Sequence, residues 1–223
     1  VLNNMLKDRY NINYKQYIDN TLDLNEFVYQ TAILSKYPME NVRGIKKSIY
    51  ARMPMKDSYL HIIGLHLNET IINYWRNKIN ITIEEHDKLI MTELFPILQE
   101  ATQLAEQDNG YVMIAGDFST FYGSNPLKII DTTKWINLMY SKKFEQGIHN
   151  RYTMWFDSDN NNQLYIDEVT DVDHVYVNKR LFDLVLTCKI QHFANTLEYT
   201  KYENHKERRL SDHFPIIVKL KFK

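Results

Sequence analysis

The sequence predicts a single α/β domain over residues 1–223, in which strands outnumber helices. Three observations predict this class. Most helix-like segments stand between strand-like segments, the chain ends in a clean alternation of apolar and polar side chains, and no linker, repeat or break in composition divides it. We expect antiparallel pairing in parts of the sheet.

The first third of the chain predicts strands separated by irregular segments. Residues 1–7 have the apolar spacing of the end of a helix, and residues 11–26 are polar, Tyr-rich and expected to be irregular. Short β-rich runs predict strands over residues 31–35 and 45–53. Residues 59–67 are apolar on both faces, which is typical of a central strand.

Residues 84–106 form the longest helical pattern. Pro96 lies inside it and predicts a kink or a split, because proline lacks the N–H that a helix interior needs. The Asp108-Asn109-Gly110 run predicts the end of the helix. One apolar stripe runs along it: Leu89, Ile90, Leu94, Ile97, Leu98, Ala101 and Leu104.

The second half predicts further strands and one short helix. A buried strand over residues 112–117 ends in Gly-Asp, and residues 133–140 have the pattern of a short helix. Strands are expected over residues 172–177 and 182–190. In the last segment, residues 216–222, apolar and polar side chains alternate, which predicts a strand with one face in a core.

The composition is that of an ordinary globular protein, with 44% hydrophobic and 25% charged residues. The net charge of -1 argues against a tight, salt-sensitive binder of duplex nucleic acid. The single cysteine, Cys188, excludes an intramolecular disulfide framework and favours a reducing, intracellular compartment.

Neither end of the chain carries a recognisable targeting segment. No stretch is long and apolar enough to span a bilayer, and no signal peptide is visible. The chain opens on Val1 inside a helix-like pattern, so we expect a piece that lacks its N-terminal part.

Polar side chains gather at the ends of the predicted strands. Carboxylates at such positions suit a hard cation such as Mg²⁺, and histidine suits proton transfer near neutral pH. Together they predict a divalent-metal hydrolase. These residues are His66, Asp117, the Asp173-His174 pair and the Asp212-His213 pair.

Five blocks, in order, resemble the endonuclease/exonuclease/phosphatase family, whose fold is DNase I-like. They span nearly the whole chain: residues 31–38, Leu65-His66-Leu67, Ile114-Ala115-Gly116-Asp117-Phe118, Val172-Asp173-His174-Val175 and Ser211-Asp212-His213-Phe214-Pro215. The resemblance implies a two-sheet α/β/β/α sandwich with helices outside, here missing its first strands. It also implies a hydrolase that uses Mg²⁺, with Mn²⁺ as a second possibility, on a phosphate ester.

By position, the resemblance implies a role for each site residue. His66 contacts the scissile phosphate or protonates the leaving oxygen, and Asp117 orients or deprotonates the attacking water. His213 stabilises the charge that develops or acts as acid and base, and Asp173 holds its imidazole in the working tautomer. Asp212 binds or orients the metal.

Two departures from the family pattern stand out. Ser119 occupies the place of the family's Asn, and it is expected to bind phosphate with a shorter arm, directly or through a water, or to leave the activity weak. The family's first metal ligand, a Glu after an early strand, belongs upstream of Val1.

Three further segments are open to two interpretations. Residues 157–168 have the ligand spacing of an EF-hand calcium loop, although an Asn-rich surface loop is favoured. The basic residues 206–209 are either a solvated run or the rim of the site. Thr153-Met154-Trp155 resembles the family's Thr-Trp segment near the site, whereas His61, His86 and His174 are interpreted as structural.

The favoured function is a nuclease-type phosphodiesterase, with nucleic acid preferred over lipid as substrate. One alternative is a catalytically weakened domain of the same fold that binds nucleic acid or protein. Another is a sphingomyelinase-like or phosphatase activity on a lipid or small molecule. An inositol-phosphate phosphatase is disfavoured, because the strand around Asp173 lacks the string typical of that branch.

Overall fold

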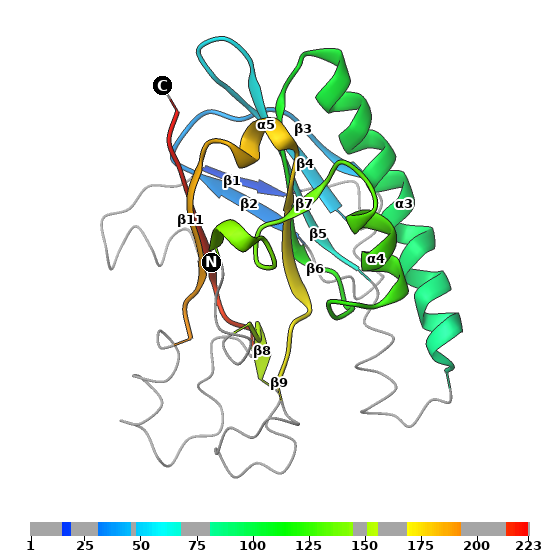
Figure 1. Ribbon diagram of the computed structural model, residues 1–223. Helices are drawn as coiled ribbons and strands as arrows, with labels where there is room; N and C mark the ends of the chain where they lie inside the picture. Colours follow the sequence, from blue (N-terminus) through cyan, green and yellow to red (C-terminus); the bar gives the residue numbers. More distant parts are fainter. Residues whose placement is uncertain are drawn as a thin grey trace, which may run out of the picture.

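A computed structural model describes residues 15–18, 31–45, 48–67, 81–144, 151–155, 169–192 and 213–222 (Figure 1). Its centre is a six-stranded sheet in the order β3-β4-β5-β6-β10-β7. The strands of this sheet are β3 (Glu40–Ile45), β4 (Ser48–Pro54), β5 (Tyr59–His66), β6 (Tyr111–Asp117), β7 (Ile136–Asn137) and β10 (Asp173–Val177).

Three two-stranded pairs accompany this sheet. They are β1 (Lys15–Ile18) with β2 (Ala32–Ser35), β8 (Met154–Trp155) with β9 (Val169–Thr170), and β11 (Val185–Ile190) with β12 (Ile216–Leu220). The described helices are α3 (Ile83–Gln107), α4 (Asn125–Asp131), α5 (Lys179–Phe182) and the 3₁₀ turn η1 (Lys142–Phe144). Among the residues with described placement, no helix is long and apolar enough to cross a membrane.

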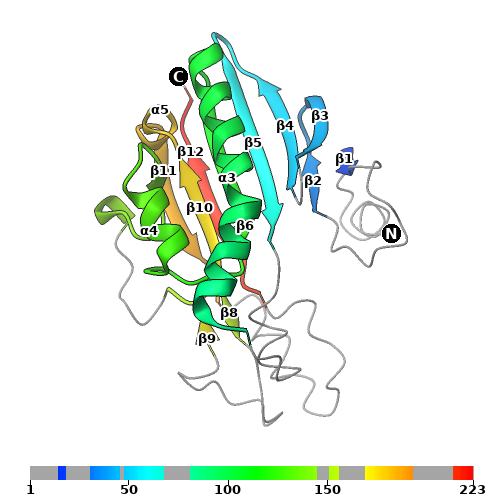
Figure 2. The same ribbon diagram turned by 90° about the vertical axis from the view of Figure 1, so that its right-hand side faces the viewer.

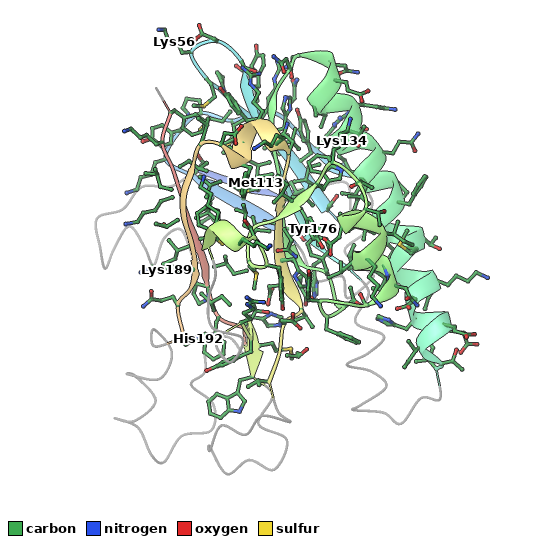
Figure 3. The ribbon with its side chains drawn as sticks, viewed as in Figure 1. Lys56, Met113, Lys134, Tyr176, Lys189 and His192 are labelled. Atoms are coloured by element: carbon green, nitrogen blue, oxygen red, sulfur yellow. The ribbon has the colours of Figure 1, made fainter. Side chains whose placement is uncertain are left out.

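Helices α3 and α4 cover one face of the sheet, and the β11–β12 pair lies against the other (Figure 2). Alternate residues of each central strand therefore enter different cores. Tyr176 of β10 points to the helical side, whereas Met113 of β6 points toward β11 (Figure 3). A second helical layer beyond β11–β12, which the predicted sandwich requires, is not among the described elements.

Helix α3 begins at a capping box, in which the Thr82 hydroxyl accepts from the backbone N–H of Glu85 and the Glu85 carboxylate accepts from the backbone N–H of Thr82. It is one continuous helix, so the predicted split at Pro96 was wrong. Leu94 and Ile97 are fully buried on either side of the proline, and this packing holds both halves against the sheet. Leu89 is 38% exposed and lies outside the apolar stripe, because it stands one helical position from Ile90.

Most predicted strands are present, with boundaries shifted by a few residues. The central strand predicted over residues 59–67 is β5, and the terminal alternation forms β12, which places Ile216, Val218 and Leu220 in the core. The structure adds β1 within the segment expected to be irregular, and β3 before the strand predicted at 45–53.

The predicted helix over residues 133–140 was wrong. Ile136 and Asn137 instead form the edge strand β7, which pairs with Val177 and Tyr176 of β10. The helix of this region is α4, which begins earlier, at Asn125, and carries Pro126 in its first turn. Tertiary pairing with β10 overrides the local helical periodicity here.

Several predictions fall on residues outside the described part of the chain. These are the helix end at residues 1–7, the calcium-type loop at 157–168, the basic run at 206–209 and the metal ligand Asp212.

Candidate active site

The register of three central strands brings the predicted site residues to one end of the sheet. Strand β5 runs parallel to β6, with His66 beside Asp117, and β10 runs antiparallel to β6, with Asp173 beside Asp117. In Figure 1 this end lies near the short strands β8 and β9. His66 and Asp117 close their strands and Asp173 opens its own, so the three side chains share one edge.

Gly116 shapes the end of β6. Its φ of +137° belongs to a region that side chains rarely adopt, and an added Cβ would lie 2.1 Å from the carbonyl oxygen of Leu65. Only glycine therefore allows β5 and β6 to stay paired up to Asp117. The sequence pattern Gly-Asp indicated a turn here. The strand register explains why the residue must be glycine, because Gly116 lies opposite Leu65.

Asp117 is the centre of the site and is mostly buried. Its Oδ1 accepts the backbone N–H of Ser119 at 2.6 Å. Its Oδ2 lies 3.3 Å from Nε2 of His66 and 3.9 Å from Nε2 of His213. One carboxylate oxygen is thus held by the loop, and the other faces two imidazoles.

His213 and Asp173 form a close pair. Nδ1 of His213 lies 2.7 Å from Oδ2 of Asp173, so its N–H donates to the carboxylate and Nε2 is left to face Asp117. Burial raises the pKa of Asp173, while the hydrogen bonds from His213 and Thr153 and the attraction of the imidazole oppose that rise. The pairing predicted for these two residues is present.

Thr153 joins this pair to the neighbouring strands. Its hydroxyl accepts the backbone N–H of Asp173 at 2.9 Å, and its carbonyl accepts the N–H of Phe214 at 2.7 Å. Met154 forms an isolated bridge with His213. Thr153 therefore positions Asp173 and the segment that carries His213. The only sign of this in the sequence was the weak resemblance of the Thr153-Met154-Trp155 segment to the family's Thr-Trp segment.

Ser119 lies beside the site but is buried. Its φ of +50° is left-handed, and its hydroxyl donates to the carbonyl of Leu67 at 3.1 Å. A second acceptor, Oδ1 of Asp117, lies farther from the hydroxyl at 3.5 Å, so the single hydroxyl hydrogen is directed to the nearer backbone carbonyl. Phosphate binding by Ser119 stays a prediction.

Two buried histidines hold the loop that follows Asp117. His86 of α3 donates from Nε2 to the carbonyl of Ser119 at 3.2 Å, and His174 of β10 donates from Nε2 to the carbonyl of Thr120 at 3.0 Å. Burial lowers the pKa of His174 to about 4, so its ring is neutral at neutral pH. Both are structural, as expected from the sequence, and they support the turn beside Asp117.

The described residues alone do not make a metal site. No group of three or more His, Cys, Asp or Glu side chains able to hold a metal ion is present among them. Asp212, the predicted metal ligand, lies outside the described part of the chain, directly before His213. Metal binding therefore stays a prediction.

Comparison with solved structures identifies the fold. Over 99% of its length the chain matches an endonuclease/exonuclease/phosphatase family protein from Leptotrichia buccalis, with a TM-score of 0.59 and 16% identity, and it covers 76% of that chain. It matches beta toxin from Staphylococcus aureus over 99% of its length and 81% of that chain, with a TM-score of 0.63 and 14% identity. It matches TDP2 from C. elegans over 96% of its length but only 59% of that chain, with a TM-score of 0.59 and 15% identity.

No protein-family model matches the chain, and no curated protein matches it by sequence. The likeness is therefore one of fold, a mixed α/β fold of the DNase I-like kind, and the chemistry depends on the residues of the site.

Proposed function

We propose that this chain, which has the fold of endonuclease/exonuclease/phosphatase family proteins, is a divalent-metal-dependent phosphodiesterase. One observation carries the proposal: Asp117 lies between His66 and a His213 that is paired with Asp173. This arrangement places a carboxylate and two imidazoles where one proton can be taken from water and another given to a leaving oxygen.

Each described residue has a defined task in this reaction. Asp117 orients a water and accepts its proton while the water oxygen attacks phosphorus. As the bond from phosphorus to the leaving oxygen breaks, Nε2 of His66 donates a proton to that oxygen. His213, held by Asp173, stabilises the charge on the phosphoryl oxygens through the hydrogen on its Nε2 when it is protonated.

We further propose Mg²⁺ as the cofactor, with Mn²⁺ as a substitute. Asp212 precedes His213 directly, so a carboxylate ligand stands next to the site along the chain, and carboxylates are ligands that Mg²⁺ prefers. The cation supplies neutralisation of charge on the phosphate when bound.

The test measures hydrolysis of bis(p-nitrophenyl) phosphate by the full-length protein with Mg²⁺ and with EDTA. We expect turnover in Mg²⁺, its loss in EDTA, and a fall of kcat by about 10³-fold in His213→Ala. His192→Gln is the matched control, because His192 is a partly buried histidine whose hydrogen bond and ring contacts are to Tyr152 and Phe214 and not to Asp117, Asp173 or His213. Normal turnover in His213→Ala would contradict the proposal.

A second function is a weakened domain of the same fold that binds nucleic acid or protein without cleaving it. The observation that favours it is the Ser119 hydroxyl, whose hydrogen is directed to the Leu67 carbonyl. If a full-length protein without measurable turnover gains hydrolysis on Ser119→Asn, this second function is supported. Normal turnover of the unaltered full-length protein excludes it.

A further inference from the structure

Two stacked tyrosines adjoin the edge that holds Asp117 and Asp173. Tyr122 follows Asp117 by five residues, and the ring of Tyr140 lies 6.3 Å from the ring of His174, the neighbour of Asp173. The rings of Tyr122 and Tyr140 have their centroids 3.4 Å apart and are nearly parallel, with 6° between their planes. Tyr122 is 40% exposed, whereas Tyr140 is half-buried. A ring open to solvent is therefore backed by a second ring.

Asp171 anchors both tyrosines. Its Oδ2 accepts the backbone N–H of Tyr122 at 3.3 Å and also the hydroxyl of Tyr140. Asp171 stands two residues before Asp173, a spacing of about 7 Å along an extended chain. The pair is thus tied to the strand that carries the catalytic carboxylate.

The loop from Asp117 to Tyr122 is itself held in place. The carbonyls of Ser119 and Thr120 accept the two buried histidines described above, and the N–H of Ser124 donates to the Phe121 carbonyl at 3.1 Å. Tyr122 therefore has a set position relative to Asp117. The sequence alone did not single out Tyr122, because nothing in the local pattern distinguishes it from the other tyrosines among the 16 in the chain.

We propose that the Tyr122–Tyr140 pair is a stacking subsite for one unpaired nucleobase next to the scissile phosphate. This inference rests on the proposed function and narrows its substrate class to single-stranded nucleic acid. Aromatic rings bind bases of any identity through their π-faces, and a sugar separates such a base from its phosphate. The subsite therefore favours substrates whose bases are not paired.

Arg151 favours a nucleotide over a choline headgroup, which aromatic rings also bind. Its guanidinium lies 4.9 Å from the centre of the Tyr140 ring. A cation at this position repels a quaternary ammonium and attracts a phosphodiester backbone. Asp171 and Asp131 place negative charge near Tyr122 as well, so the lipid arm of the experiment decides between the two ligands.

The experiment compares Tyr122→Ala, Tyr122→Phe and Phe121→Ala in the full-length protein. Phe121→Ala is the matched control, because Phe121 is an adjacent aromatic residue with 47% exposure that is not part of the stack. The probes are thymidylyl-thymidine and two analogues in which one or the other thymine is replaced by hydrogen.

We expect Tyr122→Ala to lower kcat/KM on thymidylyl-thymidine about tenfold, mainly through KM, and to leave one abasic analogue unaffected. Tyr122→Phe and Phe121→Ala should keep the values of the unaltered protein. An equal loss on all three probes, or no loss on any, would overturn the subsite. Tyr122-dependent hydrolysis of sphingomyelin vesicles without activity on the dinucleotide would overturn it in favour of a choline lipid.

A binding measurement separates this inference from the proposed function. Fluorescein-labelled tetrathymidylate is titrated with the unaltered protein and with Tyr122→Ala while the fluorescence anisotropy of the label is recorded. If no phosphodiester is hydrolysed but Tyr122→Ala weakens binding about tenfold, the proposed function fails and the subsite stands. Equal binding by both proteins overturns the subsite, whatever the activity.

Discussion

Asp173 and His174 are neighbours in β10, and they belong to regions of opposite character. Asp173 lies at the edge of the sheet that it shares with Asp117 and His66. It pairs with His213, whose side chain is 26% exposed. His174 faces the helical side, is fully buried, and holds the Thr120 carbonyl. One region holds a partly exposed imidazole beside a carboxylate, and the other holds a buried imidazole against a loop carbonyl.

The comparison shows that residue type alone does not assign a role to histidine. His213 has a carboxylate partner and solvent access, which leave one edge of its ring open to the site. His174 has a carbonyl acceptor and an amide donor from Asn137, which keep a neutral ring in one tautomer. The alternation of faces along a strand separates these two environments within one residue step.

The largest expected effect is on turnover, and it follows from a change in the Asp173–His213 pair. Asp173→Asn replaces a charged acceptor with an amide of the same shape, so His213 loses the partner that fixes its tautomer and stabilises its charge. We expect kcat to fall by about 10³-fold with little change in stability. Turnover and thermal unfolding of the same preparation check this, and unchanged turnover would show that the pair is structural only.

Gly116→Ala should disturb the surroundings of both Asp173 and His174. Gly116 pairs with His174 across β6 and β10, and it directly precedes Asp117, the partner of Asp173. The added Cβ would meet the Leu65 carbonyl oxygen at 2.1 Å with a φ of +137°, so β5 and β6 must separate. We expect a loss of more than about 3 kcal/mol in the free energy of unfolding. Urea unfolding measures it, and a loss below about 1 kcal/mol would contradict the close approach.

His174→Phe tests the buried region by itself. Phenylalanine fills much of the same space but leaves the Thr120 carbonyl and the Asn137 amide without their partner. We expect the free energy of unfolding to fall by about 2 kcal/mol. His174→Gln, which keeps a donor, should restore part of it in urea unfolding, and equal losses in both variants would show that the hydrogen bond contributes nothing.

The smallest expected effect is a change in the pH dependence of stability. The folded-state pKa of His174, about 4, lies below its ordinary 6.5, so its contribution is present above pH 6.5 and is lost as pH falls toward 4. The pKa of Asp171 is raised from 3.8 to about 6, so its contribution has the opposite sign and is lost as pH rises toward 6. The two partly cancel in the native protein.

Asp171→Asn removes one side of this balance. Relative to the native protein, the variant should lose about 1 kcal/mol more stability between pH 6.5 and pH 4, after allowance for the partial exposure of Asp171. Urea unfolding at half-unit steps of pH gives the difference curve. A flat difference between the two proteins would show that Asp171 does not titrate in this range.

Most of the strands and the chemical groups at their ends could be predicted from the sequence, because both depend on local patterns. Alternation over residues 216–222 predicted a strand and its buried face, and strand-end polar residues marked His66, Asp117, Asp173 and His213. The family resemblance predicted the fold that solved structures share with the chain.

Only the tertiary structure decided which of these groups act together. His213 meets Asp173 across 40 residues of chain, and the Ser119 hydroxyl meets the Leu67 carbonyl across 52. The stacked tyrosines and the edge strand β7 likewise depend on the place of β10 in the sheet. Such contacts are set by strand order and register, which are long-range properties, whereas periodicity and turn chemistry act over a few residues and can be read along the chain.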